Sequence, residues 1–418
     1  QTLWDRTACT MFRHCSSCTF RYACFLELSF VLVLGLATDA YQDDISPTWT
    51  LSLLQRRAGK PAHLREQTWA QARAKSICMD GHALPQLYLL GPQKSGTTTV
   101  ADDLFAAGVS GPVLSKYCHK TDMGCKELHS FDEFCGYNTT SGWPTNGSKC
   151  KFLTKTQKRH WARRFESCDS DYASGALLAD MTPVNLRLPG LAPVMADLYG
   201  ENKSSVKFII LLRNPVERMQ SGYYFNWRPY GYNFSTWIRN LVIPQEGKMQ
   251  ADGWEAALET NPHLDQLYRS MMSMQVKPWL DAFDPKQFIL VPMSPYYKNV
   301  TFRQQVFRLM QRQWNIILHE PAFEELGHEN PSAHRSLEED VEPSLINELN
   351  SKFLYPDAVD LFNLLAEAIP RGLTLAGFTG RADSAEDIGS FFDSMDYFWR
   401  VGASKLDPKL NENSMVGG

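Results

Sequence analysis

Three short apolar runs mark the chain at residues 84–90, 206–212 and 288–292, and a turn follows each of them. The runs are mostly apolar instead of alternating with polar residues. This composition is typical of strands buried on both faces, as in a parallel sheet covered by helices. In residues 98–107 the apolar positions recur at helical spacing. We therefore expect an α/β fold, with a parallel sheet flanked by helices in a single catalytic domain.

The turn after the first run is rich in glycine and reads Gly91-Pro-Gln-Lys-Ser-Gly-Thr-Thr98. Glycines in such a turn let backbone N–H groups approach an anion, and the following helix adds the positive end of its dipole. A Walker A loop for ATP would place its lysine directly after the second glycine. Here Thr97 follows Gly96, and Lys94 precedes it. The pattern indicates an anion site that differs from the usual ATP loop.

A second anion motif follows the second run, at Arg213 and Ser221. Arginine at a strand end can present its planar fork to two oxygens of a phosphate, and serine can donate its hydroxyl from the next helix. Pro215 suits the first turn of that helix, because its φ is fixed and it lacks an N–H donor. In a parallel sheet both motifs lie beyond the carboxyl ends of strands, where ligands bind.

Both motifs resemble those of sulfotransferases that use 3′-phosphoadenosine 5′-phosphosulfate (PAPS), and most resemble the membrane-bound Golgi carbohydrate branch with the heparan sulfate enzymes. The resemblance covers about residues 84–380 and implies a P-loop-type sulfotransferase fold. It implies transfer of the sulfuryl group from PAPS to a hydroxyl or amine. In that family the lysine stabilises the charge that develops on the bridging oxygen. The residues implied to bind PAPS are Lys94, Ser95, Gly96, Thr97 and Thr98 at the 5′-phosphosulfate, and Arg213 and Ser221 at the 3′-phosphate.

Transfer also needs a base for the proton of the acceptor, and the segment Lys126-Glu-Leu-His-Ser-Phe-Asp132 supplies candidates. It resembles the Lys-Glu-x-His-Phe-Phe-Asp segment of heparan-type enzymes. That match implies Glu127 as the base, with His129 and Asp132 in supporting or acceptor-binding roles. His129 is the alternative base, because cytosolic sulfotransferases use a histidine. Glutamate suits the task only if its surroundings raise its pKa toward the working pH.

The sequence departs from the family pattern in three places. Ser130 stands where an aromatic residue is common, and Met181 stands where lysine or serine often precedes Thr-Pro. A cationic contact to an acidic sugar is then missing, which argues against heparan-like substrates. The cysteine-flanked Lys-Gly loop near the C-terminus is absent, and Arg335 is the substitute we expect to contact PAPS. The histidines show no metal-ligand spacing and the chemistry needs no metal, so we expect none.

The chain of 418 residues carries 42 basic and 46 acidic side chains, and this balance argues against nucleic acid as a partner. Its longest apolar run, residues 22–38, has arginines before it and aspartates after it. The positive-inside rule then places the N-terminus in the cytoplasm and the rest in the lumen. A signal anchor and a cleaved signal peptide are both consistent with this orientation. We expect a leader at 1–40, a stem at 41–83, the sulfotransferase domain at 84–380 and a tail at 381–418.

Cysteines and glycosylation sequons favour a lumenal location. Six cysteines follow the leader, and their even number suggests disulfides whose pairing the sequence leaves open. They are Cys78, Cys118, Cys125, Cys135, Cys150 and Cys168. Sequons begin at Asn138, Asn146, Asn202, Asn233 and Asn299. We expect a type II membrane protein of the Golgi lumen or, after signal cleavage, a soluble protein of the secretory pathway.

Several alternatives stay open at this point. The acceptor is expected to be a carbohydrate, but a tyrosine or a small metabolite would need the same fold. A P-loop nucleotide phosphotransferase is a different enzyme class, against which the position of Lys94 and the lack of a clear Walker B carboxylate argue. A non-catalytic lumenal glycan-binding protein would not need Lys94 and Glu127. The oligomeric state is not indicated by the sequence.

Overall fold

The computed structural model describes residues 77–113, 126–135, 137–138, 143–144, 150–169, 177–226, 232–321, 323, 337–395 and 397. The expected leader, Arg335, Cys118 and Cys125 lie outside these residues. Within the described part of the chain, no helix combines the length and the apolar character that crossing a membrane requires. All described residues belong to one compact unit, Ala70–Gly418.

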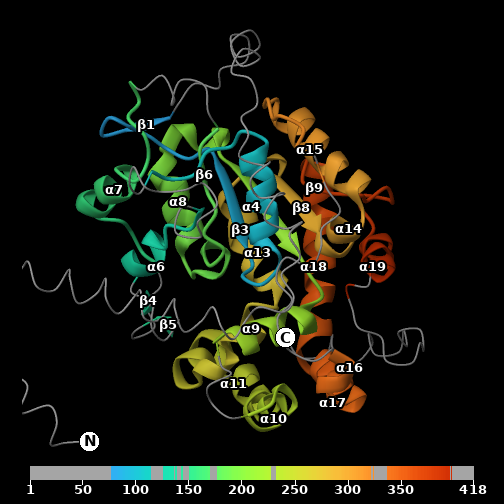
Figure 1. Ribbon diagram of the computed structural model, residues 1–418. Coiled ribbons are helices and arrows are strands. Elements are labelled where there is room, and N and C mark those ends of the chain that lie inside the picture. The colour runs from blue at the N-terminus through green and yellow to red at the C-terminus, as the bar shows by residue number, and fades with distance from the viewer. Residues whose placement is uncertain are drawn as a thin grey trace, which may run out of the picture. The chain divides into compact units, whose positions relative to one another are not determined.

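A five-stranded parallel sheet forms the centre of this unit (Figure 1). Its strands, in spatial order, are β6 (Ala179–Asp180), β3 (Leu87–Gly91), β7 (Lys207–Leu212), β8 (Phe288–Pro292) and β9 (Thr374–Leu375). All four neighbouring pairs are parallel. The predicted parallel sheet is therefore confirmed, and the three apolar runs form its three central strands. Because the strands are parallel, the segments that follow β3, β7 and β6 meet at one edge of the sheet.

Helices cover both faces of the sheet, as Figure 1 shows. Along β3, Leu87 and Leu89 pack into one core cluster, and Tyr88 and Leu90 pack into another. The cluster of Leu87 is completed by α4 (Thr97–Ala106) and α15 (Val300–Trp314). The cluster of Tyr88 is completed by α8 (Leu191–Tyr199), α13 (Met272–Ala282), α18 (Tyr355–Ala368) and α19 (Ala385–Ser394). Strands buried on both sides explain why the runs lack alternation.

A third core cluster gathers helices beyond the carboxyl ends of the strands, at the bottom of the view in Figure 1. Its helices are α9 (Pro215–Asn226), α10 (Phe234–Trp237), α11 (Glu246–Thr260), α12 (Asp265–Tyr268), α16 (Leu337–Asp340) and α17 (Pro343–Leu349). A π-helical segment, Asn350–Leu354, joins α17 to α18. Helix α9 starts three residues after β7 ends, and this short connection places it beside the loop that follows β3.

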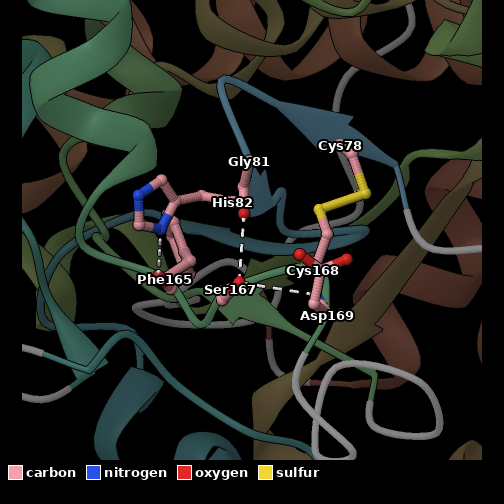
Figure 2. Close-up of a disulfide and its surroundings, with 7 residues drawn as sticks. All are labelled: Cys78, Gly81, His82, Phe165, Ser167, Cys168 and Asp169. Carbon is pink, nitrogen blue, oxygen red and sulfur yellow. Dashed lines mark hydrogen bonds between the residues drawn. A yellow bond between two sulfur atoms is a disulfide. The ribbon is translucent and has the colours of Figure 1, made fainter.

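An N-terminal hairpin is joined to the domain by a disulfide (Figure 2). Its strands are β1 (Cys78–Met79) and β2 (His82–Ala83), and Cys78 is bonded to Cys168. The imidazole Nδ1 of His82 also lies 3.0 Å from the carbonyl oxygen of Phe165. A second disulfide joins Cys135 to Cys150. These two disulfides give the pairing of four of the six cysteines, which the sequence left open.

Two structured pieces fall within the ranges that we assigned to the stem and the tail. The hairpin occupies part of range 41–83. Helix α19 occupies part of range 381–418, and its residue Phe392 stacks on Phe362 of α18 with ring centres 5.1 Å apart. Helix α19 forms in the range assigned to the tail because apolar side chains recur one turn apart in this otherwise acidic segment. These side chains are buried against α18.

Candidate active site

The loop between β3 and α4 has the backbone of an anion cradle. Lys94 has φ of 69° and Gly96 has φ of 89°, so the chain takes a left-handed turn just before the helix. No side chain caps α4 at its N-cap, Gly96. A Cβ atom at Gly96 would collide with the hydroxyl of Tyr297, so both the φ angle and the close contact require glycine here. The N–H groups that open α4 are therefore left for a ligand.

Ser95 gives this loop a buried donor. Its side chain is fully buried, and its hydroxyl has no hydrogen-bond partner among the described residues. A buried hydroxyl without a partner is costly, so such a group in a native protein calls for an explanation. An oxygen of an anion bound in the cradle would supply that partner.

The second motif contacts the first directly. Arg213 follows β7, and its Nη1 donates a hydrogen bond to the carbonyl oxygen of Lys94 over 2.7 Å. Its Nε lies 3.5 Å from a carboxylate oxygen of Glu217. Asn214 caps α9, because its Oδ1 accepts hydrogen bonds from two backbone N–H groups of the first turn. Ser221 lies further along α9 and is buried. The structure thus brings both predicted anion motifs to one place.

A buried arginine cluster behind the loop was missed by the sequence analysis. The Nη1 of Arg218 donates to the backbone oxygen of Gln93 over 3.3 Å, and Arg269 donates to the side-chain oxygen of Gln93. Arg269 and Arg187 both pair with Asp265, over 2.6 Å and 3.0 Å. Burial, with the charge of Arg269, lowers the pKa of Arg218 well below its usual value. The cluster anchors Gln93 and adds positive charge behind the loop between β3 and α4.

Lys94 lies among these cations. Burial, followed by the charges of Arg213, Arg218 and Lys126, lowers the pKa of Lys94. Its ammonium lies over the ring of Phe225, 4.3 Å from the ring centre. The surroundings of Lys94 therefore favour a bound anion, which would relieve the repulsion between the cations.

The segment with the base candidates is fixed beside β6. Its Lys126 carbonyl accepts a hydrogen bond from the backbone N–H of Met181 over 2.9 Å. The hydroxyl of Thr182 accepts from the backbone N–H of Leu128 over 2.8 Å and donates to the carboxylate of buried Asp180 over 2.6 Å. The predicted base segment is thus placed at the same sheet edge as the two anion motifs. The side chain of Met181 is buried in the core instead of facing this segment.

Glu127, His129 and Asp132 form one hydrogen-bonded chain. The Nε2 of His129 lies 3.0 Å from a carboxylate oxygen of Glu127, and its Nδ1 lies 2.8 Å from a carboxylate oxygen of Asp132. The other carboxylate oxygen of Glu127 lies 2.6 Å from the ammonium of Lys126. Hydrogen bonds to Asp132 and Glu127 raise the pKa of His129 to about 10, although burial opposes this. His129 is therefore protonated at neutral pH.

The pKa of Glu127 differs from the sequence-based expectation. Burial pushes this pKa upward, but the hydrogen bond with His129 and the charge of Lys126 outweigh burial and bring it below the usual value. We stated a raised pKa as the condition for Glu127 to act as the base, and the surroundings lower it instead. The physical reason is that two cationic neighbours stabilise the carboxylate form. Glu127 is therefore ionised at neutral pH.

Four side chains near the loop were not among the predicted site residues: Lys126, Arg218, Arg269 and Tyr297. Lys126 begins the segment that supplied the base candidates, and Arg218 lies between the predicted residues Arg213 and Ser221. Arg269 and Tyr297 carried no local pattern. Arg335 lies outside the described residues, so its contact with PAPS stays a prediction. Within the described part of the chain, no cluster of histidine, cysteine and carboxylate side chains could hold a metal ion.

Comparison of the sequence with models of known protein families identifies the family of this chain. The sequence matches the family model described as Sulfotransferase domain over residues 84–293, and the chain belongs to this family. The protein is therefore a sulfotransferase, an enzyme of sulfuryl transfer.

Sulfotransferases are among the solved structures that are similar to the chain. A crystal structure of a sulfotransferase from Alicyclobacillus acidocaldarius has a TM-score of 0.43 and 22% identity, and the match covers 68% of this chain and 96% of that chain. The sulfotransferase domain from the curacin biosynthetic pathway has a TM-score of 0.30 and 15% identity, covering 56% of this chain and 75% of that chain. No curated protein sequence matches the chain.

Proposed function

We propose that this sulfotransferase moves the sulfuryl group of PAPS to a hydroxyl or amine of a carbohydrate by in-line transfer. The observation that carries the proposal is the hydrogen bond from Arg213 to the carbonyl oxygen of Lys94. It joins two anion motifs on neighbouring strands, which suits a nucleotide that carries an anionic group at each end. The family generally uses PAPS, and this supports the same donor.

The residues of the cradle fit the 5′ end of PAPS. The buried hydroxyl of Ser95 and the uncapped start of α4 offer donors to phosphosulfate oxygens. We assign 5′-phosphosulfate binding to Lys94, Ser95, Gly96, Thr97 and Thr98, 3′-phosphate binding to Arg213 and Ser221, and a further PAPS contact to Arg335. Lys94 would stabilise the charge on the leaving oxygen, because a fixed cation in a partly buried site acts strongly there.

Glu127 is the base that the hydrogen-bond geometry favours. A protonated imidazole cannot accept a proton, and the pKa of His129 near 10 keeps it protonated at neutral pH. Glu127 is ionised and can accept the acceptor proton as the new bond to sulfur forms. His129 and Asp132 would then orient Glu127 and bind the acceptor. His129 could act as base only after losing its proton.

The proposals for the acceptor class and for the compartment rest on the base segment and on the disulfides. The base segment resembles that of carbohydrate sulfotransferases, which supports a sugar hydroxyl over a tyrosine or a small metabolite. The disulfides Cys78–Cys168 and Cys135–Cys150 support an oxidising compartment. We propose the Golgi lumen, with the leader as a membrane anchor or a cleaved signal peptide.

Thermal shift measurements with two nucleotides test the donor. Adenosine 3′,5′-bisphosphate should raise the melting temperature of the full chain, since a ligand that binds only the folded state stabilises it. ATP should have a much smaller effect. Stabilisation by ATP alone would instead support a nucleotide phosphotransferase. Labelled PAPS incubated with desulfated glycans, tyrosine peptides and small alcohols then identifies the acceptor, and the absence of any bisphosphate shift would refute the proposal.

A further inference from the structure

Thr182 joins the base segment to the sheet through its side-chain hydroxyl. It follows β6 by two residues, and it is 1% exposed. The hydroxyl oxygen accepts hydrogen bonds from the backbone N–H groups of Leu128 and His129, over 2.8 Å and 3.4 Å. One buried side chain therefore holds two consecutive residues of the segment that carries Glu127.

Asp180 fixes the direction of this hydroxyl. Its Oδ1 accepts a hydrogen bond from the hydroxyl of Thr182 over 2.6 Å and another from the backbone N–H of Thr182 over 3.0 Å. A hydroxyl has one hydrogen and two lone pairs. Because the hydrogen is donated to Asp180, both lone pairs are left for the N–H groups of Leu128 and His129. Asp180 is buried, so this hydrogen bond is formed away from water.

The backbone of His129 has an uncommon conformation. Its φ of 51° and ψ of 19° lie in the left-handed region, which a residue with a side chain seldom adopts. Such a conformation persists where the surrounding contacts impose it. Here it places the imidazole between two carboxylates, 3.0 Å from Glu127 and 2.8 Å from Asp132. The hydrogen bonds to Thr182 fix the backbone on the N-terminal side of this imidazole.

We propose that Thr182 is a positioning residue whose hydroxyl, oriented by Asp180, holds His129 in the left-handed conformation that pairs its imidazole with Glu127. The inference rests on the proposed function, in which Glu127 is the base. Thr182 acts through the backbone of the base segment and takes no part in the proton transfer. It keeps the carboxylate of Glu127 in one place before the acceptor arrives, and a general base requires such a fixed position.

Loss of the hydroxyl should change the titration of the site. The charged groups around His129 are Glu127, Asp132 and Asp180, and Lys126 pairs with Glu127. Hydrogen bonds to Asp132 and Glu127 raise the pKa of His129 to about 10. If His129 leaves the left-handed conformation, these bonds are lost and its pKa falls toward about 6.5. The pKa of Glu127 then rises, because the hydrogen bond with His129 no longer opposes burial.

Three variants of the full chain isolate the hydroxyl. Thr182→Val replaces it by a methyl group of similar size, whereas Thr182→Ser keeps it. Thr374→Val makes the same change in β9, at the opposite edge of the sheet, and serves as the control.

Three measurements compare these variants with the wild type. The first is an NMR titration of the histidine side chains, in which His129→Gln identifies the signal of His129. The second is the thermal shift with adenosine 3′,5′-bisphosphate. The third is the pH dependence of transfer from labelled PAPS to the panel of desulfated glycans, tyrosine peptides and small alcohols.

Thr182→Val should lower the pKa of His129 to below about 8, because its carboxylate partners are lost. Transfer should fall about fiftyfold, since the base is misplaced, and the acid limb of its pH profile should move to higher pH. The bisphosphate shift should be undiminished, because both nucleotide motifs are unchanged. Thr182→Ser and Thr374→Val should transfer within about twofold of the wild type and keep its histidine titration.

An unchanged titration of His129 in Thr182→Val overturns the inference, and so does a changed titration without loss of transfer. Thr182→Ser or Thr374→Val behaving like Thr182→Val also overturns it. If Thr182→Val does not fold, hydrogen exchange of the wild type decides: the amide of Leu128 should exchange about a hundredfold more slowly than an unprotected amide. Exchange at the unprotected rate overturns the inference. Failure of the proposed function looks different, because the wild type then shows no bisphosphate shift.

Discussion

At the residue scale, Lys94 carries the strongest functional expectation. Lys94→Ala should lower sulfuryl transfer by about a thousandfold, since a fixed cation no longer stabilises the leaving oxygen. The bisphosphate thermal shift should persist, because Arg213 and Ser221 are unchanged. Lys151→Ala removes an exposed lysine in the same domain and serves as the control. Full activity in Lys94→Ala, measured with labelled PAPS, would refute the assigned role.

The histidine between two carboxylates makes stability depend on pH. The pKa of His129 is raised in the folded protein to about 10, so His129 stabilises the fold fully below its unfolded pKa of about 6.5. This contribution declines as pH rises from there and is lost as pH passes about 10. His129→Gln should therefore show a smaller fall in melting temperature over that pH range than the wild type. The effect should be modest, because the side chain is 42% exposed and solvent screens it. Parallel pH curves for both proteins would contradict the assignment.

At the scale of elements, the short helix after β8, Met293–Lys298, places two tyrosines at different points along α4. The hydroxyl of Tyr297 lies against Gly96 at the start of α4, whereas the hydroxyl of Tyr296 donates to Asp103 over 2.7 Å. Tyr297→Phe should raise the KM for PAPS about tenfold with little change in stability, because a donor to an anion is lost. Tyr296→Phe should instead lower stability by about 1 kcal/mol and leave the KM unchanged. The same KM for wild type and Tyr297→Phe would remove Tyr297 from the site.

Long elements could be predicted from the sequence, whereas short ones and distant contacts could not. The strands β3, β7 and β8 were predicted from runs that are mostly apolar, and the two anion motifs were predicted at the ends of β3 and β7. The strands β6 and β9 have two residues each, which is too few for a pattern. Arg269 was missed because it contacts Gln93, 176 positions away in the chain. The direction of the pKa shift of Glu127 could not be predicted from the sequence, because it depends on the hydrogen bond with His129 and the charge of Lys126 in the folded protein.

At the scale of the whole molecule, the two disulfides should have separable effects. Cys78–Cys168 closes 90 positions of chain and Cys135–Cys150 closes 15. The chain-entropy model gives about 5 kcal/mol for the longer loop and about 3 kcal/mol for the shorter loop. Replacing both cysteines of the longer pair by serine should therefore cost more stability in a denaturant titration.

The shorter pair should matter more for activity. Cys135 ends α6 (Ser130–Phe134), the helix that begins directly after His129 and carries Asp132. The variant in which serine replaces both cysteines of the shorter pair should lose more transfer activity per unit of lost stability than the corresponding variant of the longer pair. Proportional losses in both variants would show that the shorter disulfide has no separate effect on the base segment.

In the proposed function, the contact between Arg213 and the backbone of Lys94 would couple recognition of one end of the donor to recognition of the other. A phosphosulfate that lacks the 3′-phosphate could still bind in the cradle between β3 and α4. Arg213 would then have no phosphate to bind. Discrimination against such a simpler donor would then arise where the two loops touch, and adenine contacts would not be needed for it. In the proposed function, that junction is where the enzyme would distinguish PAPS from a phosphosulfate that carries no 3′-phosphate.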